Sequence, residues 1–209
     1  MIVYHSKKTV FWRNPKTGST SMEVALRYSL PPTTDDVATP LPAFKIGGIN
    51  FSNQLDPKEG HLTPNSENDP LTQDQLEKYD HYCFIRNPIE RFISGYRHLN
   101  ASKIVNGIDP KDVHRFAEFL DLLEEREPIF RHQHKYFDAV DMKPLIFDYW
   151  KEEMDEIILK LDGKPVPQYP NLRKINLPDI TPDELSDETV ELITEFYKRD
   201  IELYEKFTA

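Results

Sequence analysis

The chain has 209 residues, 38% of them hydrophobic and 30% charged, which is typical of a soluble globular protein with one hydrophobic core. No apolar run has the length of a membrane-spanning helix and the N-terminus lacks a signal-peptide pattern, so we expect a soluble, cytoplasmic protein. The formal net charge of −10 argues against a nucleic-acid-binding protein, and the single cysteine, Cys83, excludes an intramolecular disulfide.

The first stretch with a chemical signature joins a predicted strand to a predicted helix. Thr9–Trp12 is a short apolar run, and Met22–Tyr28 is amphipathic. Between them lies Pro15-Lys16-Thr17-Gly18-Ser19-Thr20-Ser21. The first N–H groups of a helix lack intrahelical partners and attract anions, Lys16 would add a full charge, and Gly18 would let the backbone approach a ligand closely. We therefore predict a phosphate-binding loop, although a capped turn that binds nothing has the same composition. The residue order differs from that of the nucleotide-triphosphatase loop.

A long connection and a short helix follow. Residues 30–70 are rich in Pro, Thr, Asn and Asp, and a connection of this length is usually functional or disordered. It contains the pair Gly60-His61. Thr72 is then the predicted N-cap of a helix through Tyr79, with Gln75 at the capping-box position.

A second strand–helix junction lies near the middle of the chain. His81–Arg86 predicts a buried strand that contains Cys83 as a core thiol. Asn87-Pro88-Ile89-Glu90 is a helix start with a cap residue, proline at the first position and glutamate at the third. The expected inward face of this helix is Ile89, Phe92, Ile93, Tyr96 and Leu99, and the expected outward face is Arg91, Ser94, Arg97 and His98.

The rest of the chain continues the alternation of helix and strand. We predict a helix over Asp112–Glu125, a strand over Lys143–Phe147, a helix over Tyr149–Leu161 and a final helix from Thr181 almost to the end. The residues expected to face inward from the 112–125 helix are Val113, Phe116, Phe119, Leu120 and Leu123. The last helix carries an apolar stripe of Val190, Ile193, Tyr197, Ile201 and Tyr204. This alternation indicates an α/β fold with a parallel sheet and right-handed crossovers.

These motifs resemble those of the sulfotransferases that use 3′-phosphoadenosine-5′-phosphosulfate (PAPS). The 15–21 loop looks like their 5′-phosphosulfate loop, and Arg86–Tyr96 is similar to their motif R-[DN]-P-x-x-R-x-x-S-x-Y. Gly60-His61 resembles the element that supplies a catalytic base in many members. The resemblance is to the carbohydrate-type (family 2) enzymes and covers most of the chain. It extends, less specifically, to Gln133–Tyr136, Phe147–Trp150 and the set Tyr197, Asp200 and Tyr204.

The resemblance implies a single sulfotransferase domain over residues 1–209. Its fold would be a three-layer α/β/α sandwich with a parallel central sheet, like that of P-loop nucleotide hydrolases. The implied reaction moves a sulfuryl group from PAPS to a hydroxyl of a carbohydrate or small-molecule acceptor and leaves 3′-phosphoadenosine 5′-phosphate (PAP). It requires no metal, and neither a nucleic acid nor a membrane is an expected partner.

The resemblance also implies a role for individual residues. Lys16 would stabilise the leaving phosphate and His61 would be the general base, which makes these two the candidate catalytic residues. Arg86 and Ser94 would hold the 3′-phosphate. The residues that would cradle the 5′-phosphosulfate together with Lys16 are Thr17, Gly18, Ser19, Thr20 and Ser21.

Several alternatives remain open at this point. The chain could be a non-catalytic PAP-binding protein or a P-loop-type nucleotide kinase. Arg86 could instead pair with Glu90, and Arg91 could make an intrahelical pair. His132 and His134 could line the acceptor pocket, lie at the surface or bind a metal, although two ligands alone are weak evidence. Arg173 and Lys174 could reach the 3′-phosphate from a closing loop. The sequence does not identify the acceptor.

Overall fold

The computed structural model describes residues 1–30, 37–38, 44–46, 49–51, 62–66, 69–102, 112–166, 169 and 180–209. The chain divides into two compact units and passes between them several times. The first unit consists of Met1–Asn14, Gly18–Ile85 and Lys135–Leu172, and the second of Pro15–Thr17, Arg86–His134 and Arg173–Ala209.

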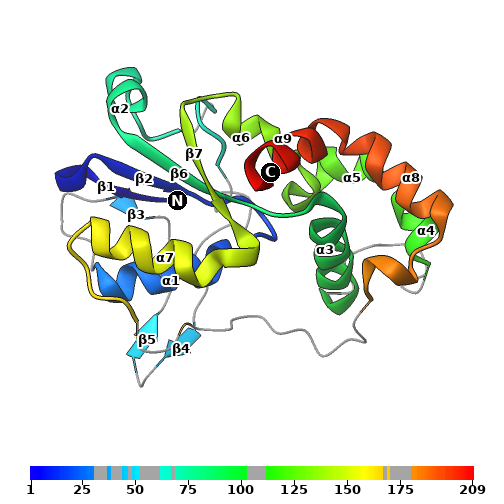
Figure 1. Cartoon of the computed structure of the whole chain (residues 1–209), viewed down its shortest axis with the longest axis horizontal. Helices are drawn as coiled ribbons and strands as arrows, with labels where there is room; N and C mark the ends of the chain where they lie inside the picture. The colour runs from blue at the N-terminus through cyan, green and yellow to red at the C-terminus, as the bar shows by residue number, and fades with distance from the viewer. Residues whose placement is uncertain are drawn as a thin grey trace. The chain divides into compact units, whose positions relative to one another are not determined.

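A mixed sheet lies in the first unit (Figure 1). Its strands are β1 (Ile2–Tyr4), β2 (Thr9–Trp12), β3 (Val37–Ala38), β6 (Asp80–Ile85) and β7 (Met142–Ile146), in the order β3-β1-β2-β6-β7. The expected parallel pairing holds for β2, β6 and β7, whereas β1 is antiparallel to both β2 and β3. A separate antiparallel pair is formed by β4 (Phe44–Ile46) and β5 (Ile49–Phe51).

The expectation of a wholly parallel sheet is therefore wrong at one edge. Sequence patterning missed β1, which is only three residues long. A single 3₁₀ turn, His5–Lys7, and Lys8 with a left-handed φ of 49° connect β1 to β2. So short a connection can only return the chain antiparallel, because a parallel crossover needs a dozen residues or more.

Helices cover both faces of this sheet. On one face, α1 (Ser19–Ser29) and α7 (Trp150–Lys160) lie side by side (Figure 1) and bury a core with Ile2, Tyr4 and Phe11. On the other, Leu76 of α2 (Gln73–Lys78) and Tyr136 of α6 (His134–Phe137) pack with Val3, Val10, Trp12 and Cys83. Successive residues of a strand point to opposite faces, so β1 and β2 contribute to both cores. Cys83 is fully buried, and that burial raises the pKa of its thiol.

The second unit is helical. It contains α3 (Pro88–Ser102), α4 (Val113–Ala117), α5 (Leu120–Arg126), α8 (Asp187–Phe196) and α9 (Lys198–Thr208), with 3₁₀ turns at Pro128–Phe130 and Pro182–Glu184. Its core is aromatic and includes Phe92, Tyr96, Phe116, Phe130 and Tyr197. Among the helices that the structure describes, none has both the length and the apolar character that crossing a bilayer requires.

Most predicted elements are confirmed, but two helices that the sequence had suggested were continuous are broken. The final α-helix does not begin at Thr181, because Pro182–Glu184 is a 3₁₀ turn and α8 starts only at Asp187, after its N-cap Ser186. The 112–125 helix divides into α4 and α5, and Phe119, which was expected inside, lies exposed at the break. The final helix divides at Tyr197, whose buried hydroxyl donates to the carbonyl of Phe130 over 2.8 Å. The capping box of Thr72 and Gln75 is present as predicted.

Candidate functional site

The first predicted phosphate loop is a tight turn between β2 and α1. Lys16 and Gly18 both have positive φ, 63° and 72°, and Gly18 is the N-cap of α1. A Cβ atom on Gly18 would come within 2.8 Å of the Phe147 ring. Glycine is therefore required here for two reasons, the backbone angle and the neighbouring ring. A left-handed lysine costs conformational energy, and such strain is concentrated at functional sites.

The first turn of α1 presents backbone N–H groups without a competing acid. It begins at Ser19, carries no acidic residue and makes no side-chain cap hydrogen bond. Thr17 and Ser19 are buried, whereas Thr20 and Ser21 are partly exposed. The Thr20 hydroxyl accepts a hydrogen bond from Arg13 Nη2 at 3.2 Å. This helix start has the donors and the dipole that favour an anion.

A buried ion cluster fixes α1 to the end of β2. Glu23 is fully buried, 3.1 Å from Arg13 Nε and 2.6 Å from Arg27 Nη2. Two arginines compensate the charge of one carboxylate. A carboxylate that is removed from water needs such partners. Arg13 is thus part of the scaffold behind the loop.

The second motif begins where β6 ends. The Asn87 side chain caps α3 by accepting from the N–H groups of Ile89 and Glu90, as predicted. The Arg86 guanidinium donates to Glu90 Oε2 from both Nε and Nη2 at 3.2 Å, and from Nη1 to the Lys16 carbonyl at 3.4 Å. The alternative pairing with Glu90 is present, and the same guanidinium also reaches the first loop. Arg86 and Lys16 belong to the same compact unit.

Ser94 lies one helical turn beyond Glu90. Residues four apart share a helix face, so Ser94 follows Glu90 along the face that Arg86 contacts. Ser94 is partly exposed, as are Arg97 and His98 of the expected outward face.

Arg91 does not lie on that outward face, which corrects the sequence prediction. Its side chain is buried and donates to the carbonyls of Ile129 at 3.3 Å and Arg131 at 2.8 Å. Its guanidinium carbon is 5.1 Å from the centroid of the Tyr197 ring. No intrahelical pair of Arg91 is seen in the described contacts; its partners belong to other segments. Arg91 therefore ties α3 to the 129–131 segment.

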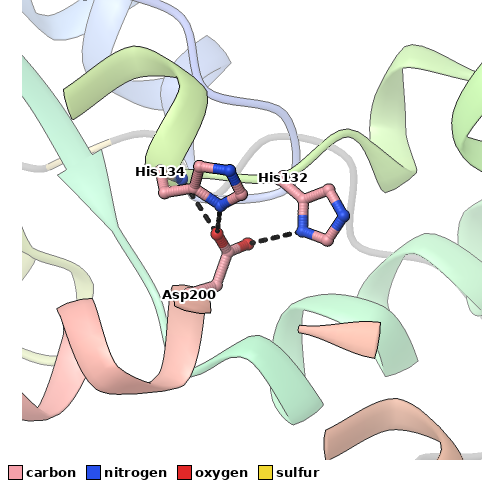
Figure 2. A group of neighbouring side chains, drawn as sticks. All are labelled: His132, His134 and Asp200. Carbon is pink, nitrogen blue, oxygen red and sulfur yellow. Dashed lines mark hydrogen bonds and ion pairs between the residues drawn. The ribbon is translucent and has the colours of Figure 1, made fainter. Parts of the chain in front are cut away.

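His132 and His134 meet Asp200 of α9 (Figure 2). His134 Nδ1 is 2.8 Å from Asp200 Oδ1, and His132 Nδ1 is 3.9 Å from Oδ2. The three side chains offer possible metal ligands within 4.8 Å of one another. Asp200 Oδ1 and Oδ2, however, also accept the backbone N–H groups of His134 and Gln133, and Arg91 Nη2 lies 3.8 Å from Oδ2. The carboxylate is therefore already neutralised and hydrogen-bonded by the protein.

The sequence named Asp200 only within the less specific part of the resemblance and gave it no role of its own. Asp200 is fully buried. Burial alone would raise its pKa, but the hydrogen bond from His134, the charge of Arg91 and the two backbone donors hold the pKa below its ordinary value. The available signal in the sequence was the set Tyr197, Asp200 and Tyr204, to which the resemblance extends.

Three residues named from the sequence, His61, Arg173 and Lys174, lie outside the described residues. The general base and the closing loop therefore stay predictions.

Comparison with protein families gives one finding. Residues 1–146 of the 209 match the profile described as the sulfotransferase family. This span contains both phosphate motifs and Gly60-His61. Comparison with curated proteins gives no match, and neither does comparison with solved structures.

Proposed function

Because this chain belongs to the sulfotransferase family, we propose that it moves a sulfuryl group from PAPS to a hydroxyl of a carbohydrate or small-molecule acceptor. The observation that supports this most directly is the contact of Arg86 with the Lys16 carbonyl. It brings the first residue of one phosphate motif against the strained lysine of the other.

Each phosphate of the donor has its own proposed binding residues. Lys16 and the N–H groups at the start of α1 bind the 5′-phosphosulfate, with hydrogen bonds from the hydroxyls of Thr17, Ser19, Thr20 and Ser21. Arg86 and Ser94 bind the 3′-phosphate, since the Arg86 guanidinium lies on the α3 face that Ser94 shares. Glu90 holds Arg86 in place before the ligand arrives.

The proposed reaction is an in-line displacement at sulfur. The acceptor oxygen forms a bond to sulfur while the bond from sulfur to the 5′-phosphate oxygen breaks. His61 takes the proton of the acceptor hydroxyl, and Lys16 together with the loop N–H groups stabilises the charge that builds on the leaving phosphate. Apart from the proton transfer to His61, these residues act by positioning and charge neutralisation, which also carry most of the catalysis in phosphoryl transfer. No step requires a metal.

We further propose that the two units form one sulfotransferase domain over residues 1–209. The β2, β6 and β7 strands and the helices on both sheet faces are consistent with a three-layer α/β/α arrangement like that of P-loop nucleotide hydrolases.

Calorimetric titration with PAP tests the donor site. We expect PAP to bind without Mg²⁺, and Arg86→Ala and Lys16→Ala each to weaken binding by about 1.5–3 kcal/mol, the usual worth of a charge-assisted contact. Arg126→Ala, which removes an exposed arginine from the end of α5, is the matched control and should bind PAP normally. Absence of PAP binding, or tighter Mg²⁺-dependent binding of ATP, would contradict the proposal and favour a kinase.

His61→Ala tests the general base. We expect PAP affinity to be unchanged and turnover to fall by roughly two to four orders of magnitude, the usual contribution of a positioned base. Single-turnover transfer from PAPS to a panel of sugar and small-molecule acceptors provides the measurement. Normal turnover by this variant would assign the base elsewhere, and PAP binding without transfer by the wild type would indicate a non-catalytic binding protein.

A further inference from the structure

The backbone of Arg86 is held by a side chain from a distant part of the same unit. Gln133 is fully buried, and its Oε1 accepts the Arg86 N–H at 3.1 Å while its Nε2 donates to the Arg86 carbonyl at 2.8 Å. Both hydrogen-bonding groups of the Arg86 main chain are thus satisfied by one amide.

This contact matters because the sheet stops one residue earlier. Ile85 is the last residue of β6 and pairs with Ile146. Arg86 comes directly after it, so strand pairing no longer fixes its φ and ψ. The Gln133 amide supplies the donor and the acceptor that a neighbouring strand would otherwise supply.

Gln133 is in turn held by Asp200. The Gln133 N–H donates to Asp200 Oδ2 at 2.7 Å, and the His134 N–H and Nδ1 reach Oδ1 at 2.9 and 2.8 Å, the latter shown in Figure 2. Asp200 is fully buried, and its negative charge is stabilised there by these donors and by the nearby Arg91.

Arg91 extends the same network by fixing the turn before Gln133. It bonds to the carbonyls of Ile129 and Arg131 from within α3. The segment from Ile129 to His134 is therefore anchored by two charged side chains, one from α3 and one from α9.

We propose that Gln133 and Asp200 are positioning residues for Arg86, and that their hydrogen bonds set the preference of the site for a nucleotide with a 3′-phosphate. The inference rests on the proposed function, in which Arg86 binds that phosphate. A guanidinium at the end of a long side chain binds an anion well only if its backbone is fixed to within a fraction of an ångström. A buried amide that touches no ligand can thus control ligand selectivity.

The test compares PAP with AMP, which lacks only the 3′-phosphate. We expect Gln133→Met, which keeps the length of the side chain and loses its hydrogen bonds, to lower the ratio of PAP to AMP affinity about tenfold. AMP affinity itself should stay unchanged. In an Arg86→Ala background the same substitution should change the ratio little, because residues that act through one contact are not additive. Gln73→Met, the same exchange on the exposed face of α2, is the matched control.

Asp200→Asn gives a second measurement. It removes the charge that holds the Gln133 N–H, and we expect the ratio of PAP to AMP affinity to fall as it does in the Gln133 variant.

Should Gln133→Met not fold, Gln133→Glu replaces it, since it keeps the oxygen that faces the Arg86 N–H and loses the donor to the Arg86 carbonyl.

The outcomes separate this inference from the proposed function. An unchanged ratio in the Gln133 variant, or equal losses for PAP and AMP, would overturn the inference and leave Gln133 a purely structural residue. If Arg86→Ala lowers the ratio while Gln133→Met does not, the inference fails and the proposed donor site stands. A wild type that binds no PAP would overturn both.

Discussion

Gly18 combines two requirements that a larger residue would break. Its φ of 72° disfavours any side chain, and an added Cβ would meet Phe147 at 2.8 Å. We expect Gly18→Ala to lower the free energy of unfolding by about 1–3 kcal/mol, the range for strained backbone positions. We also expect weaker PAP binding, because the start of α1 would shift. Denaturant unfolding and calorimetry provide the two measurements.

Gly95→Ala is the matched control for Gly18. Its Cβ would meet the Phe130 ring at 2.9 Å, a similar contact, but Gly95 lies within α3 and its φ is not positive. Alanine is favoured over glycine inside a helix, so Gly95→Ala should destabilise the protein less than Gly18→Ala. Equal losses would mean that the backbone angle of Gly18 contributes nothing.

Arg86 and Arg91 show which part of a site a motif can predict. Both arginines belong to the pattern Arg-Asn-Pro-x-x-Arg, and nothing in the neighbouring sequence predicts that only one of them is buried. Arg91 is buried because its partners are the carbonyls of Ile129 and Arg131, about forty residues away in the chain. Site residues could be predicted where a helix start or a glycine marks the position in the local sequence. Gln133 and Asp200 could not be given a role, because their function depends on contacts between distant segments.

At the scale of single elements, β6 carries a titratable residue in its buried face. Trp12 Nε1 donates to His81 Nδ1 at 3.0 Å, so His81 must carry its proton on Nε2, which reaches the Leu76 carbonyl at 2.9 Å. Burial lowers the pKa of His81 below its ordinary value of 6.5. The imidazole is therefore neutral in the folded protein, where it links β2, β6 and α2.

The neutral state of His81 predicts an acid-sensitive stability. Below about pH 6.5 the His81 side chain becomes protonated in the unfolded chain but stays neutral in the folded protein. The free energy of unfolding should therefore fall as the pH drops from 7 to 5, by at most about 1.4 kcal/mol per pH unit for this one group. His81→Gln, which keeps a donor and an acceptor, should flatten that part of the profile. Parallel profiles for the two proteins would contradict this assignment.

Local sequence signals predicted the helices and strands where those signals are strong. They failed where packing between distant segments determines the structure. The start of α3 at Asn87-Pro88 and the capping box of α2 need only neighbouring residues, and both are present. The breaks at Phe119 and Tyr197 have no such signal, since the apolar spacing continues through them. β1 was missed because three residues are too few to show a period.

At the scale of the whole molecule, each unit has its own hydrophobic core, but neither unit is formed by one continuous stretch of chain. The second unit includes Pro15–Thr17, inserted between two segments of the first. Both tryptophans of the chain, Trp12 and Trp150, belong to the first unit. Tryptophan fluorescence therefore reports on the first unit alone.

Because the chain passes repeatedly between the units, we expect them to unfold together. Phe116→Ala, in the aromatic core of the second unit, should cost about 3–5 kcal/mol, as is usual for a buried phenylalanine. The loss should appear equally in tryptophan fluorescence and in circular dichroism, as two-state unfolding requires. A fluorescence transition that does not move while the dichroism transition does would show that the units unfold independently.

The fully buried Cys83 makes this protein convenient to label. A thiol reacts as its thiolate, and the raised pKa of Cys83 and its burial within β6 suppress that form. A dye could therefore be attached to one introduced cysteine without replacing the native one. Tyr149 is 63% exposed and lies two residues from Phe147, the ring that an added Cβ on Gly18 would meet. A fluorophore on Tyr149→Cys would be attached two residues from that ring, and we expect it to follow the arrival of a nucleotide at the start of α1 in real time.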